Sequence, residues 1–112
     1  MEIKDIQNWE RDFSARKGIT SEKEEQVRIA VFKLVEEVGE AVKAILENHW
    51  GEVQGELSDV IVFTCKIANI AEDFYKTDKL EDVLKRKINY CENRTYNKSS
   101  NKFNKPEDKE FR

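Results

Sequence analysis

Two short acidic segments hold the residues whose types and spacing are best suited to chemistry. The first is Glu36-Glu37-Val38-Gly39-Glu40, and the second is Glu56-Leu57-Ser58-Asp59. Within each segment carboxylates stand three or four residues apart, so on a helix they project from one side. Two such helices packed face to face would concentrate carboxylates that only protons or hard cations can stabilise. We therefore predict a magnesium site at these segments.

The first acidic segment also allows a simpler interpretation. On a helical wheel its apolar arc centres near Leu34 and Val38. Glu36 and Glu40 fall mostly away from that arc, and Glu37 borders it. Taken alone, this segment is more typical of a solvated helix face than of a metal site.

The second acidic segment favours the metal site. Glu56 projects from the middle of an apolar arc that includes Val60 and Phe63, and Asp59 sits at the edge of that arc. A carboxylate directed into a core costs several kcal/mol unless it is paired or metal-bound. A lysine can satisfy one such group, but it serves a second acid one turn away less well. The two segments together therefore predict a metal site.

Oxygen ligands without clustered His or Cys suit Mg²⁺, with Mn²⁺ as the alternative, better than Zn²⁺. Sites of this kind keep several waters and fill their other positions with substrate phosphates. A bound cation would neutralise phosphate oxygens and acidify an attacking water, and a spare carboxylate would take the proton. This chemistry indicates hydrolysis of a phosphoanhydride.

The composition predicts that helices carry these segments. The chain has 112 residues, of which 38% are charged, with four Gly and one Pro. Such a composition favours an all-α domain with charged outer faces. We predict a domain over residues 1–96 and a polar tail over 97–112. Four helices are expected, over residues 3–16, from a cap at Thr20 or Ser21 to about 48, over about 52–75, and from 80 to about 94. A capping box between Ser21 and Glu24 would stabilise the start of the second helix. A turn is expected at His49-Trp50-Gly51.

Charge and cysteine usage limit the partners and the compartment. The net charge is −3 despite 20 basic residues, so we expect no general binding to nucleic acid. Cys65 and Cys91 lack a disulfide framework, which favours a reducing, cytoplasmic location. The start of the chain does not resemble a signal peptide, and its apolar runs are too short to span a bilayer. We therefore expect a soluble protein without a membrane partner.

The paired acidic segments resemble the EExxE…ExxD signature of the MazG-like nucleoside triphosphate pyrophosphohydrolases. This all-α superfamily includes the dimeric dUTPases and the dCTP pyrophosphatases. The resemblance extends from about Trp9 to Tyr96 and includes Arg16-Lys17-Gly18 and the closing Asn93-Arg94-Thr95-Tyr96. It implies a four-helix-bundle-like domain completed by oligomerisation, as a homodimer or homotetramer. It also implies hydrolysis of a nucleoside triphosphate between the α and β phosphates, giving the monophosphate and pyrophosphate.

The resemblance also implies roles for single residues. Glu37, Glu40, Glu56 and Asp59 would bind the metal, and Glu36 would add a ligand or, with Glu37, help activate water. Lys87 and Arg94 match basic positions that close the family motif, and they would grip phosphate. The spacing around Lys87 and the long tail depart from the family pattern.

Phe63 lies one turn beyond Asp59 and is a candidate for stacking on the nucleobase. Trp9, Phe13 and Trp50 are alternatives, and each aromatic also fits an ordinary core position. Lys85-Arg86-Lys87 also fits a solvated helix face. Two other functions stay open: a module that binds nucleotide or metal without turnover, and a helical adaptor whose acids are only solvated.

Overall fold

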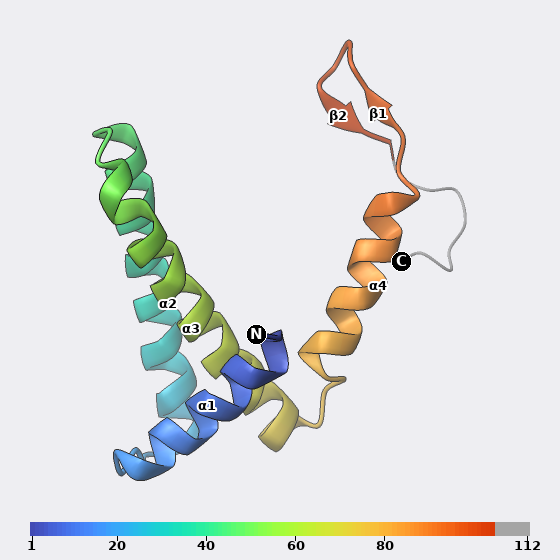
Figure 1. The fold of residues 1–112 in the computed structure, drawn as a ribbon. Helices are drawn as coiled ribbons and strands as arrows, with labels where there is room; N and C mark the ends of the chain where they lie inside the picture. Colours follow the sequence, from blue (N-terminus) through green and yellow to red (C-terminus); the bar gives the residue numbers. More distant parts are fainter. Residues whose placement is uncertain (105–112) are drawn as a thin grey trace. The chain divides into compact units, whose positions relative to one another are not determined.

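The computed structural model describes residues 1–104, which form four helices and one short hairpin. These elements are α1 (Ile3–Arg16), α2 (Lys23–Leu46), α3 (Trp50–Tyr75), α4 (Leu80–Glu92), β1 (Tyr96–Asn97) and β2 (Lys102–Phe103) (Figure 1). The predicted all-α class is confirmed. Within this described range, no helix has both the length and the apolar character that crossing a membrane requires. The chain divides into two compact units, at residues 1–77 and from residue 78 onward.

In the first unit α2 and α3 form an antiparallel helical hairpin (Figure 1). The turn between them is tighter than predicted. Asn48 adopts a left-handed backbone with φ of 60°, and the His49 amide donates to the Ala44 carbonyl at 2.8 Å. Asn tolerates this conformation better than most residues, so the chain reverses early and α3 begins at Trp50. The prediction of a turn at His49-Trp50-Gly51 was therefore wrong.

The ends of α1 and α2 show one correct and one wrong prediction. Gly18 ends α1 as predicted, with φ of 69°. The capping box between Ser21 and Glu24 does not form, because α2 begins later, with Glu22 as its N-cap. The Gln26 side chain instead donates to the Ser21 carbonyl at 2.6 Å, which fixes the approach to the helix.

Small residues line the seam between α2 and α3. Ala30, Ala41 and Ala44 are the buried residues of α2, and they allow the two helices to approach closely. Glu37 lies on the same stripe, between Ala30 and Ala41. The predicted centre of the apolar arc is displaced, since Val38 is 43% exposed. The buried face of α2 is thus a stripe of alanines that includes a glutamate.

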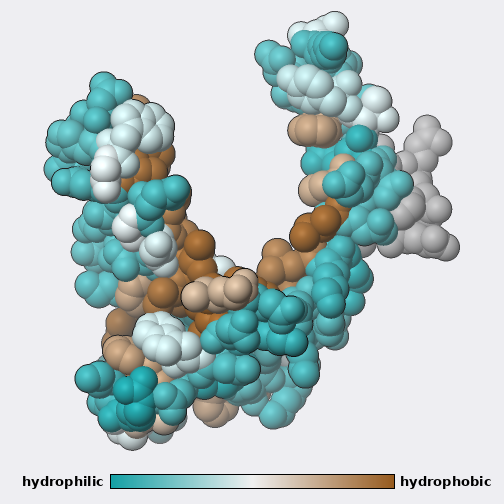
Figure 2. Space-filling view, in the orientation of Figure 1, coloured by the Kyte–Doolittle hydropathy of each residue, from teal (hydrophilic) through white to brown (hydrophobic). Residues whose placement is uncertain are grey.

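The larger apolar side chains of α2 are open to solvent. Phe32 is 69% exposed and Val35 is 66% exposed. Figure 2 shows apolar surface (brown) among the polar residues of this unit. A single copy therefore leaves a substantial apolar surface uncovered.

A buried polar contact joins α1 to α3. Gln7, Glu10 and Asn69 are at most 5% exposed. The Asn69 amide donates to the Gln7 carbonyl at 2.9 Å and to the Glu10 carboxylate at 2.8 Å, and the Gln7 amide returns a bond to Asn69 at 2.9 Å. Because such bonds have strict geometry, they set the register of the two helices.

The second unit consists of α4 and the β1–β2 hairpin. Tyr96 pairs with Phe103 across the hairpin, a feature that the sequence analysis did not predict. The helix ends at Glu92, two residues before the predicted limit. The last part of the predicted tail, residues 105–112, lies outside the described residues. The division into 1–96 and 97–112 stays a prediction, as does completion of the domain by oligomerisation.

Candidate metal centre

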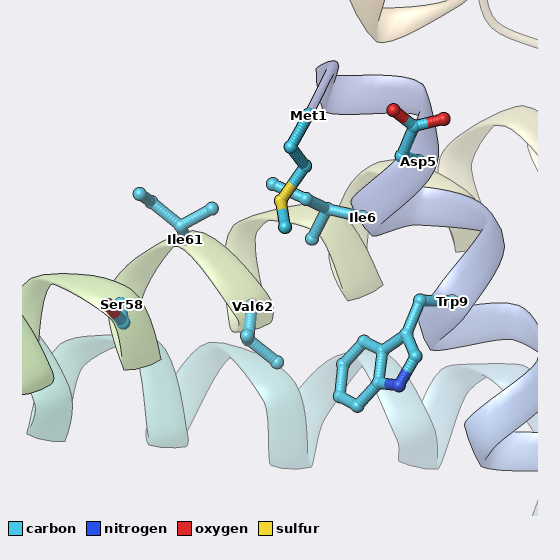
Figure 3. Close-up of a pocket in the computed structure, with 7 residues that line it drawn as sticks. All are labelled: Met1, Asp5, Ile6, Trp9, Ser58, Ile61 and Val62. Carbon is cyan, nitrogen blue, oxygen red and sulfur yellow. The ribbon is translucent and has the colours of Figure 1, made fainter.

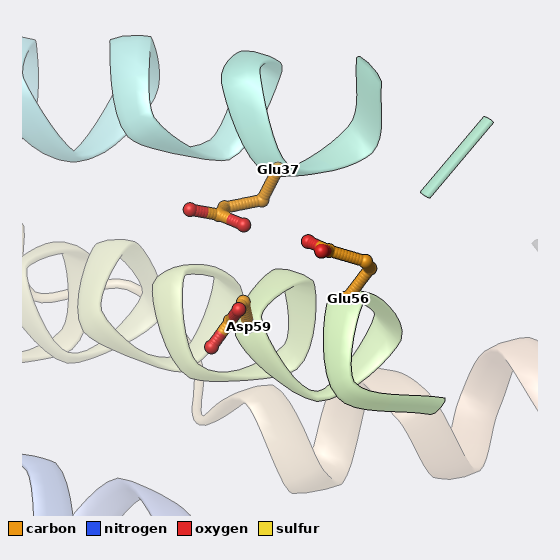
Figure 4. Close-up of side chains that lie close together, drawn as sticks. All are labelled: Glu37, Glu56 and Asp59. Atoms are coloured by element: carbon orange, nitrogen blue, oxygen red, sulfur yellow. The ribbon is translucent and has the colours of Figure 1, made fainter. Parts of the chain in front are cut away.

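The helical hairpin brings three of the predicted metal ligands together. Glu37 extends from α2 into the space between the helices, toward Glu56 and Asp59 of α3 (Figure 4). One carboxylate oxygen from each residue lies within 4.8 Å of the other two. Glu37 and Glu56 are half-buried and Asp59 is exposed. The cluster is therefore open to solvent on one side, as a site that admits a substrate must be.

The cluster contains polar atoms that the protein itself does not satisfy. The Oε2 atoms of Glu37 and Glu56 are buried and find no hydrogen-bond partner among the described residues. Within the same range, no ion pair involves Glu37, Glu40, Glu56 or Asp59. Buried carboxylate oxygens without a donor or a cation are costly.

Mutual repulsion raises the proton affinity of this cluster. Burial, followed by the negative charges of Glu40 and Asp59, raises the pKa of the Glu37 carboxyl to about 7. The pKa of Glu56 is also raised, first by its hydrogen-bonding proximity to Glu40 and then by burial. Glu40, although exposed, thus belongs to the same electrostatic group. Four carboxylates, two of which have a buried oxygen without a partner among the described residues, fit a hard divalent cation.

Glu36 lies apart from this group. Its side chain is 53% exposed, and it pairs with Lys33 at 3.4 Å, one turn earlier on α2. Adjacent helical residues differ by about 100° in direction, so Glu36 and Glu37 cannot share one face. Its predicted role as a further ligand or in activating water stays a prediction.

A pocket of about 390 Å³ is lined by residues of α1, α2 and α3, among them Lys33 and Phe63, each four residues from a carboxylate of the cluster. Trp9, Phe13 and Phe63 contribute aromatic side chains to its lining, and Trp9 stacks on Phe13 with ring centroids 5.0 Å apart. Phe63 follows Asp59 by four residues, which is roughly 6 Å along a helix. Phe63 therefore lines a pocket one turn from Asp59, whereas Trp50 does not, and the base-stacking role of Phe63 stays a prediction.

A second hollow, of about 500 Å³, opens between the start of α1 and the middle of α3 (Figure 3). Its lining is mostly apolar and includes Ile6, Trp9 and Ile61. Its polar members already have partners: Asp5 accepts from the Glu2 amide, and Ser58 donates to the Gln54 carbonyl, both at 2.7 Å.

Lys87 and Arg94 belong to the second unit. The Lys87 ammonium lies 5.8 Å from the centroid of the Tyr90 ring. The Arg94 guanidinium lies over the Phe103 ring at 5.2 Å and donates to the carbonyls of Phe103 and Asn104 at 3.1 and 3.3 Å. Arg94 thus joins the hairpin to α4, and phosphate binding by both residues stays a prediction.

Sequence reasoning missed a buried charged group beside the aromatic pocket. The Lys66 ammonium lies 3.3 Å from the Glu10 carboxylate, and both side chains are at most 14% exposed. One signal was present in the sequence, because Lys66 and Asn69 are polar residues three apart within the apolar run of α3. The partner on α1 is 56 residues away, so only the packing of α1 on α3 reveals the pair.

Comparison with known proteins adds one match. The family model of the MazG nucleotide pyrophosphohydrolase domain matches residues 17–98. The match includes all four clustered carboxylates and begins just after α1. No curated protein and no solved structure shows a significant match to this chain.

Proposed function

Because the chain belongs to the MazG nucleotide pyrophosphohydrolase family, we propose that it hydrolyses nucleoside triphosphates with the help of Mg²⁺. Cleavage between the α and β phosphates would give a nucleoside monophosphate and pyrophosphate. The observation that carries this proposal is the carboxylate cluster, in which three oxygens lie within 4.8 Å of one another. Two of its oxygens are buried and have no partner among residues 1–104.

In this proposal Glu37, Glu40, Glu56 and Asp59 hold the cation, with Mn²⁺ as the alternative to Mg²⁺. When bound, the cation neutralises phosphate oxygens and lowers the pKa of an attacking water. In the metal-free protein burial and its neighbours raise the pKa of Glu37 to about 7, so binding of the cation near neutral pH would release a proton from this cluster. Glu36, whose side chain pairs with Lys33, would turn toward the cluster to add a ligand or to help activate water.

The nucleobase is proposed to enter the pocket lined by Phe63, Trp9 and Phe13. Aromatic faces stack on a base with little dependence on its identity, so they supply affinity rather than selection. The pocket begins one helical turn from the carboxylates on both helices, with Lys33 on α2 and Phe63 on α3. Lys87 and Arg94 are proposed to contact the phosphates.

We also propose that the protein works in the cytoplasm as a homodimer or homotetramer. The exposed side chains of Phe32 and Val35 support self-association, since apolar surface of this kind usually marks an interface. Light scattering should give a molar mass at least twice 13.2 kDa, and Val35→Glu should lower it. A wild-type protein that is monomeric at micromolar concentration would contradict this proposal.

A panel of ribo- and deoxyribonucleoside triphosphates with Mg²⁺ tests the proposed activity. Each reaction is scored for pyrophosphate and for orthophosphate. We expect at least one nucleotide to yield pyrophosphate and monophosphate in equal amounts. A panel in which every nucleotide stays intact, with the protein folded and Mg²⁺ present, would reject the proposal.

A further inference from the structure

The aromatic pocket beside the carboxylates has one charged wall. Lys66 on α3 and Glu10 and Ser14 on α1 form this wall. The other charged residue of the lining, Lys33 on α2, is half exposed and pairs with Glu36 at 3.4 Å. Lys66 follows Phe63 by three residues, so both side chains project from the same side of α3. A base that stacks on Phe63 therefore has its edge close to Lys66.

The Lys66 ammonium retains an unused hydrogen-bond donor. An ammonium carries three N–H groups. One is directed to Glu10 Oε2, with the two atoms 3.3 Å apart, and a second to Ser14 Oγ at 3.1 Å. Within residues 1–104 the third finds no acceptor. Lys66 lines both the aromatic pocket and a neighbouring hollow of about 290 Å³, so this N–H is open to a ligand on that side of the molecule.

The Glu10 carboxylate, in contrast, is already well supplied with donors. It accepts hydrogen bonds from the Ser14 hydroxyl, the Asn69 amide and the Lys66 ammonium. Glu10 is only 5% exposed, so it holds the ammonium in place from behind. A ligand at this wall therefore meets a hydrogen-bond donor, the Lys66 ammonium.

We propose that Lys66 is a specificity-determining residue that selects nucleobases with an exocyclic carbonyl oxygen. Uracil, thymine, guanine and hypoxanthine present such an acceptor at the edge away from the sugar, whereas cytosine presents an amino group there and has its carbonyl beside the sugar. Adenine presents an amino group, which would direct N–H groups toward the ammonium and leave the buried donor unpaired. This inference rests on the proposed function and names the substrate class of the same site.

The hollow between the start of α1 and the middle of α3 does not offer this selection. Its polar side chains, Asp5 and Ser58, are already hydrogen-bonded within their own helices or caps. The family match begins at residue 17, so Glu10 and Ser14 lie outside it. The charged wall therefore combines Lys66, inside the matched range, with two residues of the first helix outside it.

Paired purine substrates test the inference. The bases of dITP and dATP share the purine ring system and differ at C6, which carries a carbonyl in dITP and an amino group in dATP. We expect kcat/KM of the wild-type protein to favour dITP roughly tenfold to a hundredfold, the range of one hydrogen bond to a charged group. Lys66→Met should remove this preference, mainly by lowering kcat/KM for dITP. Lys66→Arg keeps a cationic donor and should restore much of it.

Further variants separate selection from folding. Lys66→Met leaves Glu10 buried without a cation, so the double variant with Glu10→Gln supplies a neutral version of the wall. Glu10→Gln alone keeps the ammonium and should keep the preference for dITP. Equal turnover of dITP and dATP by the wild type, or an equal loss of both in the Lys66 variants, would overturn the inference alone. Turnover of no nucleotide would overturn the proposed function as well.

Discussion

Replacing Asp59 with Asn, or Glu40 with Gln, should abolish pyrophosphate release while the helices stay folded. Asp59 supplies one of the three carboxylate oxygens that lie within 4.8 Å of one another, and the charge of Glu40 raises the pKa of Glu37 in the same cluster. Each substitution therefore removes one of the proposed anionic ligands. A cation at a phosphoryl centre supplies several kcal/mol of transition-state stabilisation, so we expect kcat/KM to fall at least about a hundredfold. Initial rates of pyrophosphate release measure this loss.

The same variants should not destabilise the metal-free protein. Each removes a negative charge from a group that has no cationic partner among residues 1–104, so the melting temperature should rise or stay unchanged. Glu25→Gln is the matched control, because Glu25 is exposed on the same helix, about four turns before Glu40. It should keep wild-type turnover. Wild-type turnover in both Asp59→Asn and Glu40→Gln would rule out the proposed metal site.

The stability of the metal-free protein should fall as pH rises through neutrality. The pKa of Glu37 is raised from 4.5 to about 7, so between these values the folded protein holds more protons than the unfolded chain. The stabilisation from this proton is fully present below pH 4.5 and is lost as pH rises through 7. Glu56 shifts in the same direction. Melting temperatures from pH 5 to pH 8 in EDTA measure the trend, and Glu37→Gln should weaken it.

Mg²⁺ should reverse this trend. Cations bind deprotonated carboxylates, so the stabilisation by Mg²⁺ should grow as pH rises through 7. At a hundredfold excess over Kd we expect the melting temperature at pH 8 to rise by roughly 10 °C or more. A helical adaptor with solvated acids would show no such shift. A module that binds without turnover would show the shift but release no pyrophosphate.

Much of the fold follows from helical periodicity. The apolar spacing and the scarcity of Gly and Pro predicted four helices, and α1 and the end of α3 lie where they were expected. Helix starts were less predictable, because a cap depends on local geometry. Ser21 and Glu24 have the spacing of a capping box, yet α2 begins after both the serine and Glu22. Because Asn48 adopts a left-handed backbone, the chain reverses earlier than predicted and α3 begins at Trp50.

The carboxylate site was predictable because its residues lie close together in sequence on two helices. Glu56 stood out as an acid within an apolar arc. The position of Glu37 was harder to judge, because the largest apolar residues of α2 suggested a different buried face. In the structure the seam is made of Ala30, Ala41 and Ala44, and Glu37 faces α3. Volume, rather than hydrophobicity, decides which face of α2 meets α3.

The charged wall of the aromatic pocket lay beyond sequence reasoning. In the sequence, Glu10 is one of several acidic residues in a charged amphipathic helix, and Lys66 is an isolated basic residue in an apolar helix. Their contact depends on how α1 crosses α3, which Gln7 and Asn69 set through buried hydrogen bonds. Such long-range polar contacts leave no periodic pattern in a single sequence.

The most direct measurement is the simultaneous quantification of pyrophosphate and orthophosphate released from an accepted nucleotide by the wild-type protein. With Mg²⁺ present, we predict pyrophosphate and monophosphate in equal amounts and no orthophosphate above background. Excess EDTA should stop the reaction, and added Mg²⁺ should restore it. Release of orthophosphate alone, or pyrophosphate release that persists in EDTA, would contradict cleavage between the α and β phosphates by a metal centre at Glu37, Glu40, Glu56 and Asp59.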